Sequence, residues 1–425
     1  MQKITCPHLP SAKADGRRVL HIDFDSFFAS CEQQFNPLLR NKPLGVTATN
    51  GRTCIIASSR EAKRLGIKTG ARTYEALKIC PTLNLAPANF VKYLEVSKKF
   101  LKICQSFSPE VELFSIDEVF MDITLTNHLF GGVYSTIKLL KKEIREKIGE
   151  HITVSVGISH NKLLAKLASS INKPDGVFEI TKDNLGAVYA KAKLTDVCGI
   201  GERIKLRLNK IGIYNLLQLR DANLSLLIQE FGSAEAEFLH QVGLGLSTDV
   251  LSSYTKTPEV KSVGRNYCLP QNEYNKKVVL QNIYELCEEV CIKLRRLNKK
   301  ARTVGYYFGG NINLHQRKTY TKYFDTGKEM FDLLTNLVNV NNFKYVRQIG
   351  ITASGLEDSS NTPLSLFDSS AKQNSLQQTV DFINERFGDH TIRNGFLLYS
   401  DKLTTVPNGY MADKYERTKL AAESI

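Results

Sequence analysis

The sequence lacks the features that mark membrane-spanning, secreted and zinc-binding proteins. It contains no apolar run of about 18 residues, the length that a membrane-spanning helix needs, and no segment that resembles a signal peptide. Its 9 cysteines are scattered and odd in number, without a CxxC pair or a cysteine–histidine spacing typical of zinc sites. We therefore expect a reduced, cytoplasmic protein.

Acidic residues are in the minority. The 425-residue chain has 57 Lys and Arg against 43 Asp and Glu, which gives a net charge of +14. This balance favours a polyanionic partner, of which nucleic acid is the commonest and a membrane surface the second. The length accommodates about two to four domains. The net charge restricts the class of partner, but it determines neither the fold nor the activity.

Positive charge is also missing around one unusual motif. No Lys or Arg occurs between Lys102 and Lys138, yet Asp117 and Glu118 stand inside the apolar run 113–121. The flanking apolar residues predict a short buried strand or hairpin. Because buried carboxylates need a cation, the compensating charge must come from elsewhere in the fold or from a metal. A surface hairpin with solvated acids is the alternative that this stretch leaves open.

A second acidic motif ends the first predicted strand, residues 19–25. Asp23 and Asp25 stand at its end, and Phe27 and Phe28 open the helix that follows. Strand ends are rigid and open, and are therefore typical places for a site. Alternation along the strand predicts that Asp23 and Asp25 share a face, opposite Phe24. The pair alone is also compatible with one ligand or cap and one structural residue.

The predicted elements from 90 to 180 follow the order helix, hairpin, helix and strand. Apolar periodicity predicts helices over 89–106, 133–149 and 161–170, and a strand over 152–158. Together with the first strand this is an α+β, ferredoxin-like split β-α-β arrangement. That topology places Asp23 beside Asp117 and Glu118, where three carboxylates repel one another unless divalent cations lie between them.

A smaller unit precedes these elements. Residues 42–58 predict a strand pair around the Asn50-Gly51 turn, and 59–66 predict a helix. Arg60 and Lys63 share one face of that helix and are placed to hold one anion together. A solvated basic helix face is the alternative.

Two later segments have features of nucleic-acid binding. Gly199 and Gly201 lie in a hairpin between helices, which can present backbone N–H groups to a phosphate. An ordinary helical hairpin is the alternative. After a polar linker, the strand-and-helix unit that opens at Lys261 and Arg265 has a basic rim suited to a nucleic-acid backbone, or a solvated charged face.

The polar tail after residue 358 carries three apolar residues close together, Leu364, Leu366 and Phe367. An exposed peptide of this kind predicts docking into a pocket on a partner protein. We also expect one short helix over 376–388.

Taken together, these motifs resemble the Y-family translesion DNA polymerases over residues 18–356, and the tail resembles the DNA polymerase V branch of that family. The motifs occur in chain order: Asp23-Phe24-Asp25-Ser26-Phe27-Phe28, Ser115-Ile116-Asp117-Glu118, Val156-Gly157-Ile158-Ser159, Lys173-Pro174-Asp175-Gly176, Gly199-Ile200-Gly201 and Lys261-Ser262-Val263-Gly264-Arg265. As a set they are specific, whereas each alone is weak to moderate.

The resemblance implies a right-hand architecture and a reaction. Template-directed, low-fidelity DNA synthesis from dNTPs is expected, with primer–template DNA, a sliding clamp and accessory activating proteins as partners. The implied domains are a palm (1–26 and 87–180), fingers (27–86), a helix-hairpin-helix thumb (181–247), a linker (248–258), a little finger (259–358) and a tail (359–425).

The resemblance also implies a metal centre. Asp23, Asp117 and Glu118 match the ligands of two Mg²⁺ ions, with the Phe24 carbonyl as a further ligand. These ions would activate the primer 3′-hydroxyl and neutralise charge on the leaving pyrophosphate.

The substrate-binding residues follow from the same resemblance. Phe28 matches the steric gate that rejects a ribose, Phe27 packs beside it, and Lys173 matches the lysine that reaches the triphosphate. Arg60 and Lys63 replace the family's usual Tyr and Arg, and we expect Arg60 to make the main phosphate contact with help from Lys63.

The remaining implied contacts are to DNA and to the clamp. Gly199, Gly201, Lys261 and Arg265 match positions that contact DNA, and 364–367 matches the clamp peptide. Pro363 replaces its usual Gln, so we expect weak docking that depends on tethering.

Two other functions fit part of the pattern. A nucleotidyl cyclase shares the palm and its carboxylates, but it needs neither the glycine hairpin nor the basic second module. A DNA-binding scaffold without activity requires the loss of a carboxylate, and all three are present.

Overall fold

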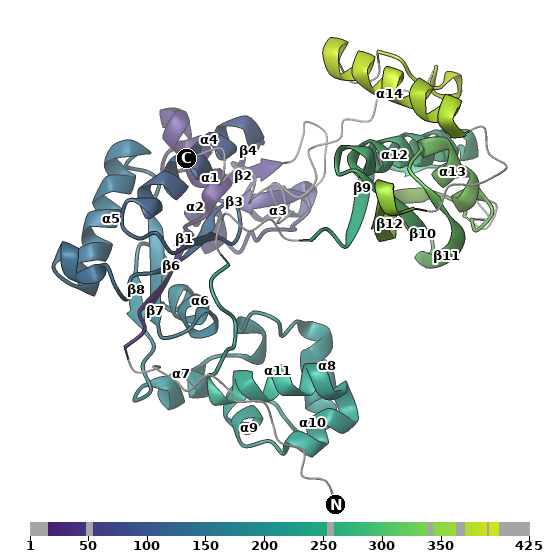
Figure 1. Cartoon of the computed structure of the whole chain (residues 1–425). Coiled ribbons are helices and arrows are strands. Elements are labelled where there is room, and N and C mark those ends of the chain that lie inside the picture. Colours follow the sequence, from purple (N-terminus) through teal and green to yellow (C-terminus); the bar gives the residue numbers. More distant parts are fainter. Residues whose placement is uncertain are drawn as a thin grey trace, which may run out of the picture. The chain divides into compact units, whose positions relative to one another are not determined.

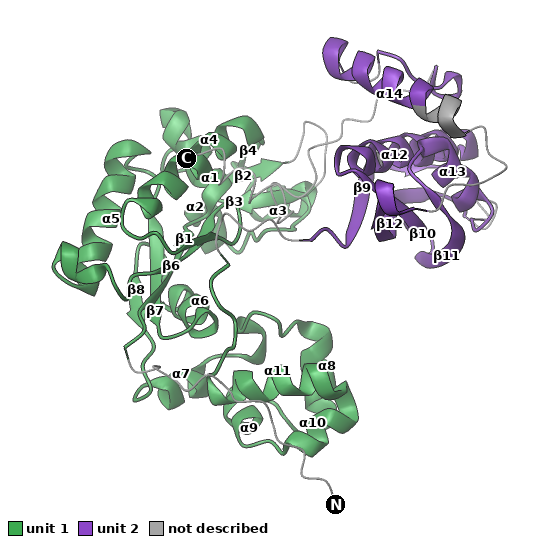
Figure 2. Ribbon diagram, viewed as in Figure 1, with its two compact units in different colours: residues 1–258, 410–425 green, residues 259–409 purple. Residues whose placement is uncertain are grey.

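The computed structural model describes residues 16–47, 54–252, 259–338, 343–362, 370–388 and 391–398. The chain divides into two compact units, residues 1–258 with 410–425 and residues 259–409 (Figure 2). Most helices and strands of each unit are labelled in Figure 1. In the described part of the chain, every helix is too short or too polar to cross a membrane.

A five-stranded sheet forms the centre of unit 1, with strand order β5-β6-β1-β7-β8. β1 lies between β6 and β7 and is antiparallel to both, whereas β7 and β8 are parallel. The strands are β1 (Val19–Phe24), β5 (Val111–Leu113), β6 (Glu118–Asp122), β7 (Val154–Ser159) and β8 (Val177–Glu179). The α+β class and the order of elements expected from the sequence are confirmed.

Alternation along β1 separates two faces of this sheet. Leu20, Ile22 and Phe24 join the apolar core shared with α4 (Phe90–Gln105) and α5 (Val133–Lys147). The opposite face carries His21 and Asp23 and is contacted by α6 (Lys162–Ile171). The predicted site therefore lies on the α6 side of the sheet.

Gly157 in β7 explains why α6 lies so close to the sheet. A Cβ atom at this position would come within 2.0 Å of the Ala165 carbonyl oxygen and 2.3 Å of the Ser169 nitrogen. A side chain here would push the helix away, so glycine is required for the close approach. The approach brings polar residues of α6 next to the carboxylate-bearing strands.

A small three-stranded sheet, ordered β3-β2-β4, follows the first helix. It consists of β2 (Leu44–Thr47), β3 (Ile55–Ser58) and β4 (Asn84–Pro87), with α1 (Phe27–Phe35), α2 (Arg60–Arg64) and α3 (Thr73–Ile79) around it. Ser59 caps α2, because its Oγ accepts the N–H of Ala62 at 3.2 Å. The predicted antiparallel strand pair is found, and its Asn50-Gly51 turn lies outside the described residues.

Residues 185–244 of unit 1 are mainly helical and pack around a second apolar core. Gly199, at a φ of 99°, precedes α8, and Gly201 occupies the position before its first residue. The helices are α7 (Leu185–Lys191), α8 (Glu202–Lys210), α9 (Leu216–Arg220), α10 (Leu224–Phe231) and α11 (Ser233–Leu244).

Unit 2 is a four-stranded sheet, ordered β11-β10-β12-β9, packed against two helices. Its elements are β9 (Ser262–Glu273), α12 (Lys276–Arg296), β10 (Lys299–Gly310), β11 (Leu314–Phe324), α13 (Gly327–Thr335) and β12 (Val346–Asp358). The strand-and-helix unit expected from the sequence is found, with β11 at one edge of its sheet. Most side chains of β11 are exposed, so the strand shows no apolar alternation.

The C-terminal segment packs on α12. Helix α14 (Ser370–Phe387) is longer than the helix predicted over 376–388. Asp381 on α14 forms two hydrogen bonds with the Arg295 guanidinium, at 2.6 and 2.7 Å. Downstream, the Phe396 carbonyl accepts a hydrogen bond from Gln281 at 2.8 Å. The predicted clamp residues Leu364, Leu366 and Phe367 lie outside the described residues.

Candidate active site

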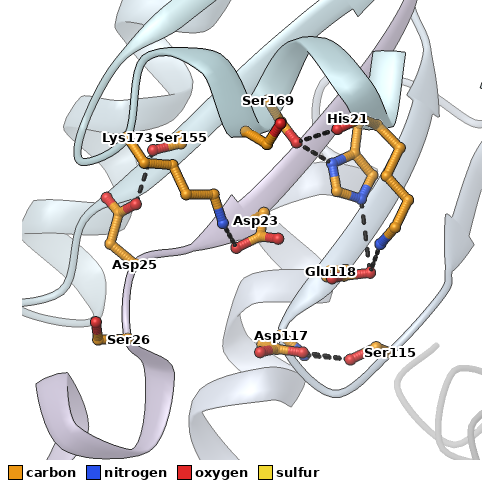
Figure 3. A network of polar contacts seen from close by, with 12 residues as sticks. His21, Asp23, Asp25, Ser26, Ser115, Asp117, Glu118, Ser155, Ser169 and Lys173 are labelled. Atoms are coloured by element: carbon orange, nitrogen blue, oxygen red, sulfur yellow. Dashed lines mark hydrogen bonds and ion pairs between the residues drawn. The ribbon is translucent and has the colours of Figure 1, made fainter. Parts of the chain in front are cut away.

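The register of β1 and β6 brings the predicted carboxylates together. Asp23 pairs directly with Glu118 across the two strands, so both side chains stand on the same face. Asp117 precedes β6, and its carbonyl oxygen accepts the Phe24 N–H at 3.0 Å. Figure 3 shows the three carboxylates around one space. The structure therefore assembles this part of the predicted site at the end of β1.

Two lysines lie against these carboxylates. Lys173 Nζ is 2.5 Å from Asp23 Oδ1, and Lys166 of α6 contacts Glu118 Oε2. Burial raises the pKa of Asp23 to about 7, although Lys173 opposes the shift. Burial alone would also raise the pKa of Glu118, but the His21 ring and the Lys166 ammonium outweigh it and lower that pKa to about 2.

Asp117 has a weaker partner. Its carboxylate accepts a hydrogen bond from the Ser115 hydroxyl, and burial raises its pKa. Three carboxylates thus share the site with two lysine partners. The excess of negative charge makes the site attractive to a cation.

His21, like Lys166, is a residue of this site that sequence reasoning missed. Its ring is fully buried, with Nδ1 2.7 Å from Ser169 Oγ and Nε2 3.7 Å from Glu118 Oε2. Burial lowers the pKa of His21 to about 4, so the ring is neutral at pH 7. The signal was available in the sequence, because a residue two positions before Asp23 on a strand faces the same side.

Asp25 departs from the expectation that it shares a face with Asp23. β1 ends at Phe24, and the buried Asp25 carboxylate turns toward β7. It accepts hydrogen bonds from Thr153 Oγ1 at 2.6 Å and Ser155 Oγ at 2.7 Å. Asp25 is therefore a structural anchor beside the site, because alternation holds only while the strand continues.

An aromatic cluster borders the carboxylates. Phe24, Phe27 and Phe28 line a cavity of about 250 Å³ that also reaches Asp23. Phe24 stacks on Phe27 at 4.9 Å, and Phe28 stacks on Tyr93 at 4.4 Å between ring centroids. These contacts fix the Phe28 ring at the wall of the cavity.

The cationic side of the cavity differs from the expected one. Lys63 and Lys173 are among the residues that line it, and Lys63 Nζ donates to Ser26 Oγ at 2.8 Å. Arg60 turns away, with Nη2 3.5 Å from Asp25 Oδ2. The expectation that Arg60 makes the main phosphate contact is therefore at odds with this geometry, because a buried carboxylate outside the cavity already holds its guanidinium.

The predicted DNA-contacting residues lie in both units. Gly199 and Gly201 flank the start of α8 in unit 1. In unit 2, Lys261 is exposed at the start of β9, while Arg265 forms an ion pair with Glu289 of α12 at 3.0 Å. The Arg265 side chain therefore has an internal partner.

Comparisons with known proteins identify relatives along most of the chain. A family model described as "impB/mucB/samB family" matches residues 22–170, and one described as "impB/mucB/samB family C-terminal domain" matches residues 260–366. A protein named DNA polymerase IV from Pelotomaculum thermopropionicum is 30% identical over 380 residues, covering 88% of this chain and 94% of the relative. Another from Moorella thermoacetica is 30% identical over 395 residues, covering 89% and 96%.

A solved structure is also similar. It is described as a Y-family DNA polymerase chimera of Dbh and Dpo4 and has a TM-score of 0.67 at 28% identity, covering 80% of this chain and 98% of the other. The relatives carry the name DNA polymerase IV, so the expected similarity to the DNA polymerase V branch is not supported. That expectation came from a short tail motif, which weighs less than a match along most of the chain.

Proposed function

Because this chain belongs to the Y-family of DNA polymerases, we propose that Asp23, Asp117 and Glu118 hold two Mg²⁺ ions during template-directed translesion DNA synthesis. The observation that carries the proposal is the direct pairing of Asp23 with Glu118 across β1 and β6, with Asp117 adjacent. This pairing fixes the carboxylates on rigid strands, as a reaction centre requires.

The donor set fits a hard divalent cation. Carboxylate oxygens from Asp23, Asp117 and Glu118, with the Phe24 carbonyl, are the ligand type that Mg²⁺ prefers. Bound there, the ions would lower the pKa of the primer 3′-hydroxyl and neutralise charge on the leaving pyrophosphate. The high pKa of Asp23 supports the assignment, because a nearby cation would restore the ionised form that burial disfavours.

The cavity beside the carboxylates suits a deoxynucleoside triphosphate. We assign the two lysines that line it, Lys63 and Lys173, to the phosphates, because ammonium groups act as point charges toward them. Phe28, held by Tyr93 at the cavity wall, would exclude a ribose 2′-hydroxyl by contact with its ring. Phe27 supports this wall through its stacking on Phe24.

The domain assignment follows the family's architecture. The five-stranded sheet would be the palm, the small sheet with α2 and α3 the fingers, the helices within residues 181–247 the thumb, and residues 259–358 the little finger. Gly199, Gly201, Lys261 and Arg265 are proposed to contact the DNA backbone, and 364–367 a sliding clamp. Accessory activating proteins are proposed as further partners, and the cytoplasm is the proposed location because bacterial DNA lies there.

Primer extension tests the proposal directly. With a primed DNA template, dNTPs and Mg²⁺, the full chain should add nucleotides, and Asp117→Ala should abolish the addition while DNA binding persists. Glu110→Ala is the matched control, because this carboxylate is exposed on the same segment of chain. Extension by Asp117→Ala at the level of the control would refute the assignment. No extension by any variant, with DNA binding intact and accessory proteins added, would favour the inactive scaffold.

A further inference from the structure

His21 has an unused nitrogen inside the acidic site. The ring is fully buried, and within the described part of the chain Nε2 has no hydrogen-bond partner. Oε2 of Glu118 lies 3.7 Å from it, which is too far for a hydrogen bond. A buried polar atom without a partner is costly, so its retention needs an explanation.

The Ser169 hydroxyl gives Nδ1 of His21 a hydrogen-bond partner of the kind that a metal-binding histidine has. Ser169 Oγ donates to the Lys166 carbonyl at 2.9 Å and lies 2.7 Å from His21 Nδ1. A serine has one hydroxyl hydrogen, so when that hydrogen is donated to the Lys166 carbonyl, Oγ accepts from Nδ1–H and leaves the Nε2 lone pair available to a metal ion. Figure 3 shows that Nε2 faces Glu118. Metal-binding histidines have this arrangement, in which the second ring nitrogen is held by a hydrogen bond.

One nitrogen and two carboxylate oxygens meet beside Nε2 of His21 as possible metal ligands. One nitrogen of His21 and one oxygen each from Asp23 and Glu118 all lie within 4.8 Å of one another. Mg²⁺ prefers oxygen ligands alone, whereas Zn²⁺ combines imidazole with carboxylate. The set therefore differs from the proposed Mg²⁺ ligands, because it includes His21 and leaves out Asp117.

We propose that His21, Asp23 and Glu118 form a Zn²⁺ site whose occupation inhibits DNA synthesis. The ion would use two of the three carboxylates assigned to Mg²⁺, so the two metals cannot occupy their sites together. The inhibitory effect depends on the proposed function, whereas Zn²⁺ binding does not.

Two ammonium groups oppose binding at this site. Lys173 contacts Asp23 and Lys166 contacts Glu118, so Zn²⁺ must compete with both for the carboxylates. Removing the charge of Lys166 should therefore strengthen Zn²⁺ binding, while removing the His21 nitrogen should weaken it. Variants with opposite effects separate a metal ligand from a residue that merely stabilises the fold.

Zn²⁺ binding is measured on the full chain without DNA or dNTPs, by competition with a chromophoric chelator. His21→Phe should lower the Zn²⁺ affinity by at least about 10-fold, because even the removal of a residue that hydrogen-bonds a metal ligand has an effect of this size. Lys166→Met should raise it, and His128→Phe, which replaces an exposed histidine on η2 (Asn127–Phe130), should leave it unchanged. Equal affinities of wild type and His21→Phe would overturn the proposal.

X-ray absorption at the zinc edge gives a second readout. Imidazole scattering should be present in the wild type and lost in His21→Phe, and its absence from the wild type would overturn the proposal. If circular dichroism shows that His21→Phe is unfolded, Ser169→Ala replaces it. That variant should weaken Zn²⁺ binding, and unchanged binding would count against the proposal.

Primer extension at constant Mg²⁺ completes the test, and added Zn²⁺ should inhibit it in the wild type. If Zn²⁺ binding depends on His21 but the wild type adds no nucleotides in Mg²⁺, the proposed function is refuted and the zinc site is not. An active wild type that binds no Zn²⁺ would defeat the zinc site alone.

Discussion

The guanidinium of Arg60 lies against the buried carboxylate of Asp25, with Nη2 3.5 Å from Oδ2. The contact joins helix α2 to the end of β1 and is supported by a hydrogen bond from Arg60 to Thr153. Arg60 therefore connects the small sheet's helix to the central sheet. The neighbouring Lys63 is left as the residue of α2 that lines the cavity.

This difference predicts the effects of two substitutions on substrate binding. Lys63→Ala should raise the KM for dNTPs by about 10-fold, since a charge-assisted hydrogen bond is worth about 1.5–3 kcal/mol. Arg60→Ala should raise it less. Arg64→Ala, an exposed basic residue of the same helix, is the control. Steady-state primer extension measures all three, and a larger effect of Arg60→Ala would restore the role expected from the sequence.

Removing the Asp25 carboxylate should destabilise unit 1. Asp25→Ala would leave the hydroxyls of Thr153 and Ser155 and the N–H of Asp175 without their acceptor. We expect a loss of about 3 kcal/mol in the free energy of unfolding, measured in urea. The exposed Asp183→Ala should change it by less than about 0.5 kcal/mol. A comparably small effect of Asp25→Ala would show that water replaces the carboxylate at no cost.

Mg²⁺ binding should release a proton near neutral pH. Burial raises the pKa of Asp23 from 3.8 to about 7, so at about pH 6 most metal-free molecules are protonated there, and a bound cation would displace that proton. Calorimetry in two buffers of different ionisation enthalpy should show the release at about pH 6 and its disappearance at about pH 8.5. Asp23→Asn should abolish it, and release that continues in this variant would assign the proton to another group.

The same pKa has a consequence for stability without metal. Between about pH 4 and pH 7 the folded protein keeps the Asp23 proton while the unfolded chain has lost it. The contribution of this group to the free energy of unfolding therefore falls as the pH rises through that window. Asp23→Asn should flatten the pH dependence there in urea unfolding.

Phe28 should control the choice of sugar. Phe28→Ala removes a ring that lines the cavity and stacks on Tyr93. Incorporation of ribonucleotides relative to deoxynucleotides should rise by at least about 10-fold, since a steric contact discriminates by about 1–3 kcal/mol. The ratio of kcat/KM values for rNTP and dNTP checks this, and an unchanged ratio would remove Phe28 from the role of steric gate.

Asp381 should hold α14 on unit 2. Its two hydrogen bonds to Arg295 are the bidentate kind, and Asp381→Ala leaves a largely buried guanidinium without them. Limited proteolysis should cleave near α14 faster in this variant. Glu385→Ala, an exposed acid of the same helix, should behave like the wild type. Equal cleavage of both variants would assign the docking to Phe396 and its apolar contacts.

The meeting of Asp23 with Asp117 and Glu118 was predictable, because it follows from strand alternation and from the order of elements. The positions of Asp25 and Arg60 were not. The end of β1 at Phe24 decides where Asp25 points, and a long arginine side chain reaches partners that only tertiary packing places beside it. His21 was not predicted as a site residue, because a histidine in an apolar strand is usually a core residue. The roles of the DNA-contacting and clamp residues stay predictions.

The pairing of Asp23 with Glu118 also limits how this chain can change in length. A strand places successive side chains on opposite faces, so one residue inserted between Val19 and Asp23 would turn the carboxylate toward the core beneath α4 and α5. The same insertion in the segment between β2 and β3 would leave every carboxylate in place. Insertions and deletions should therefore be tolerated between β2 and β3. Within β1 and β6 they should abolish activity, even where all the carboxylates of the site are retained.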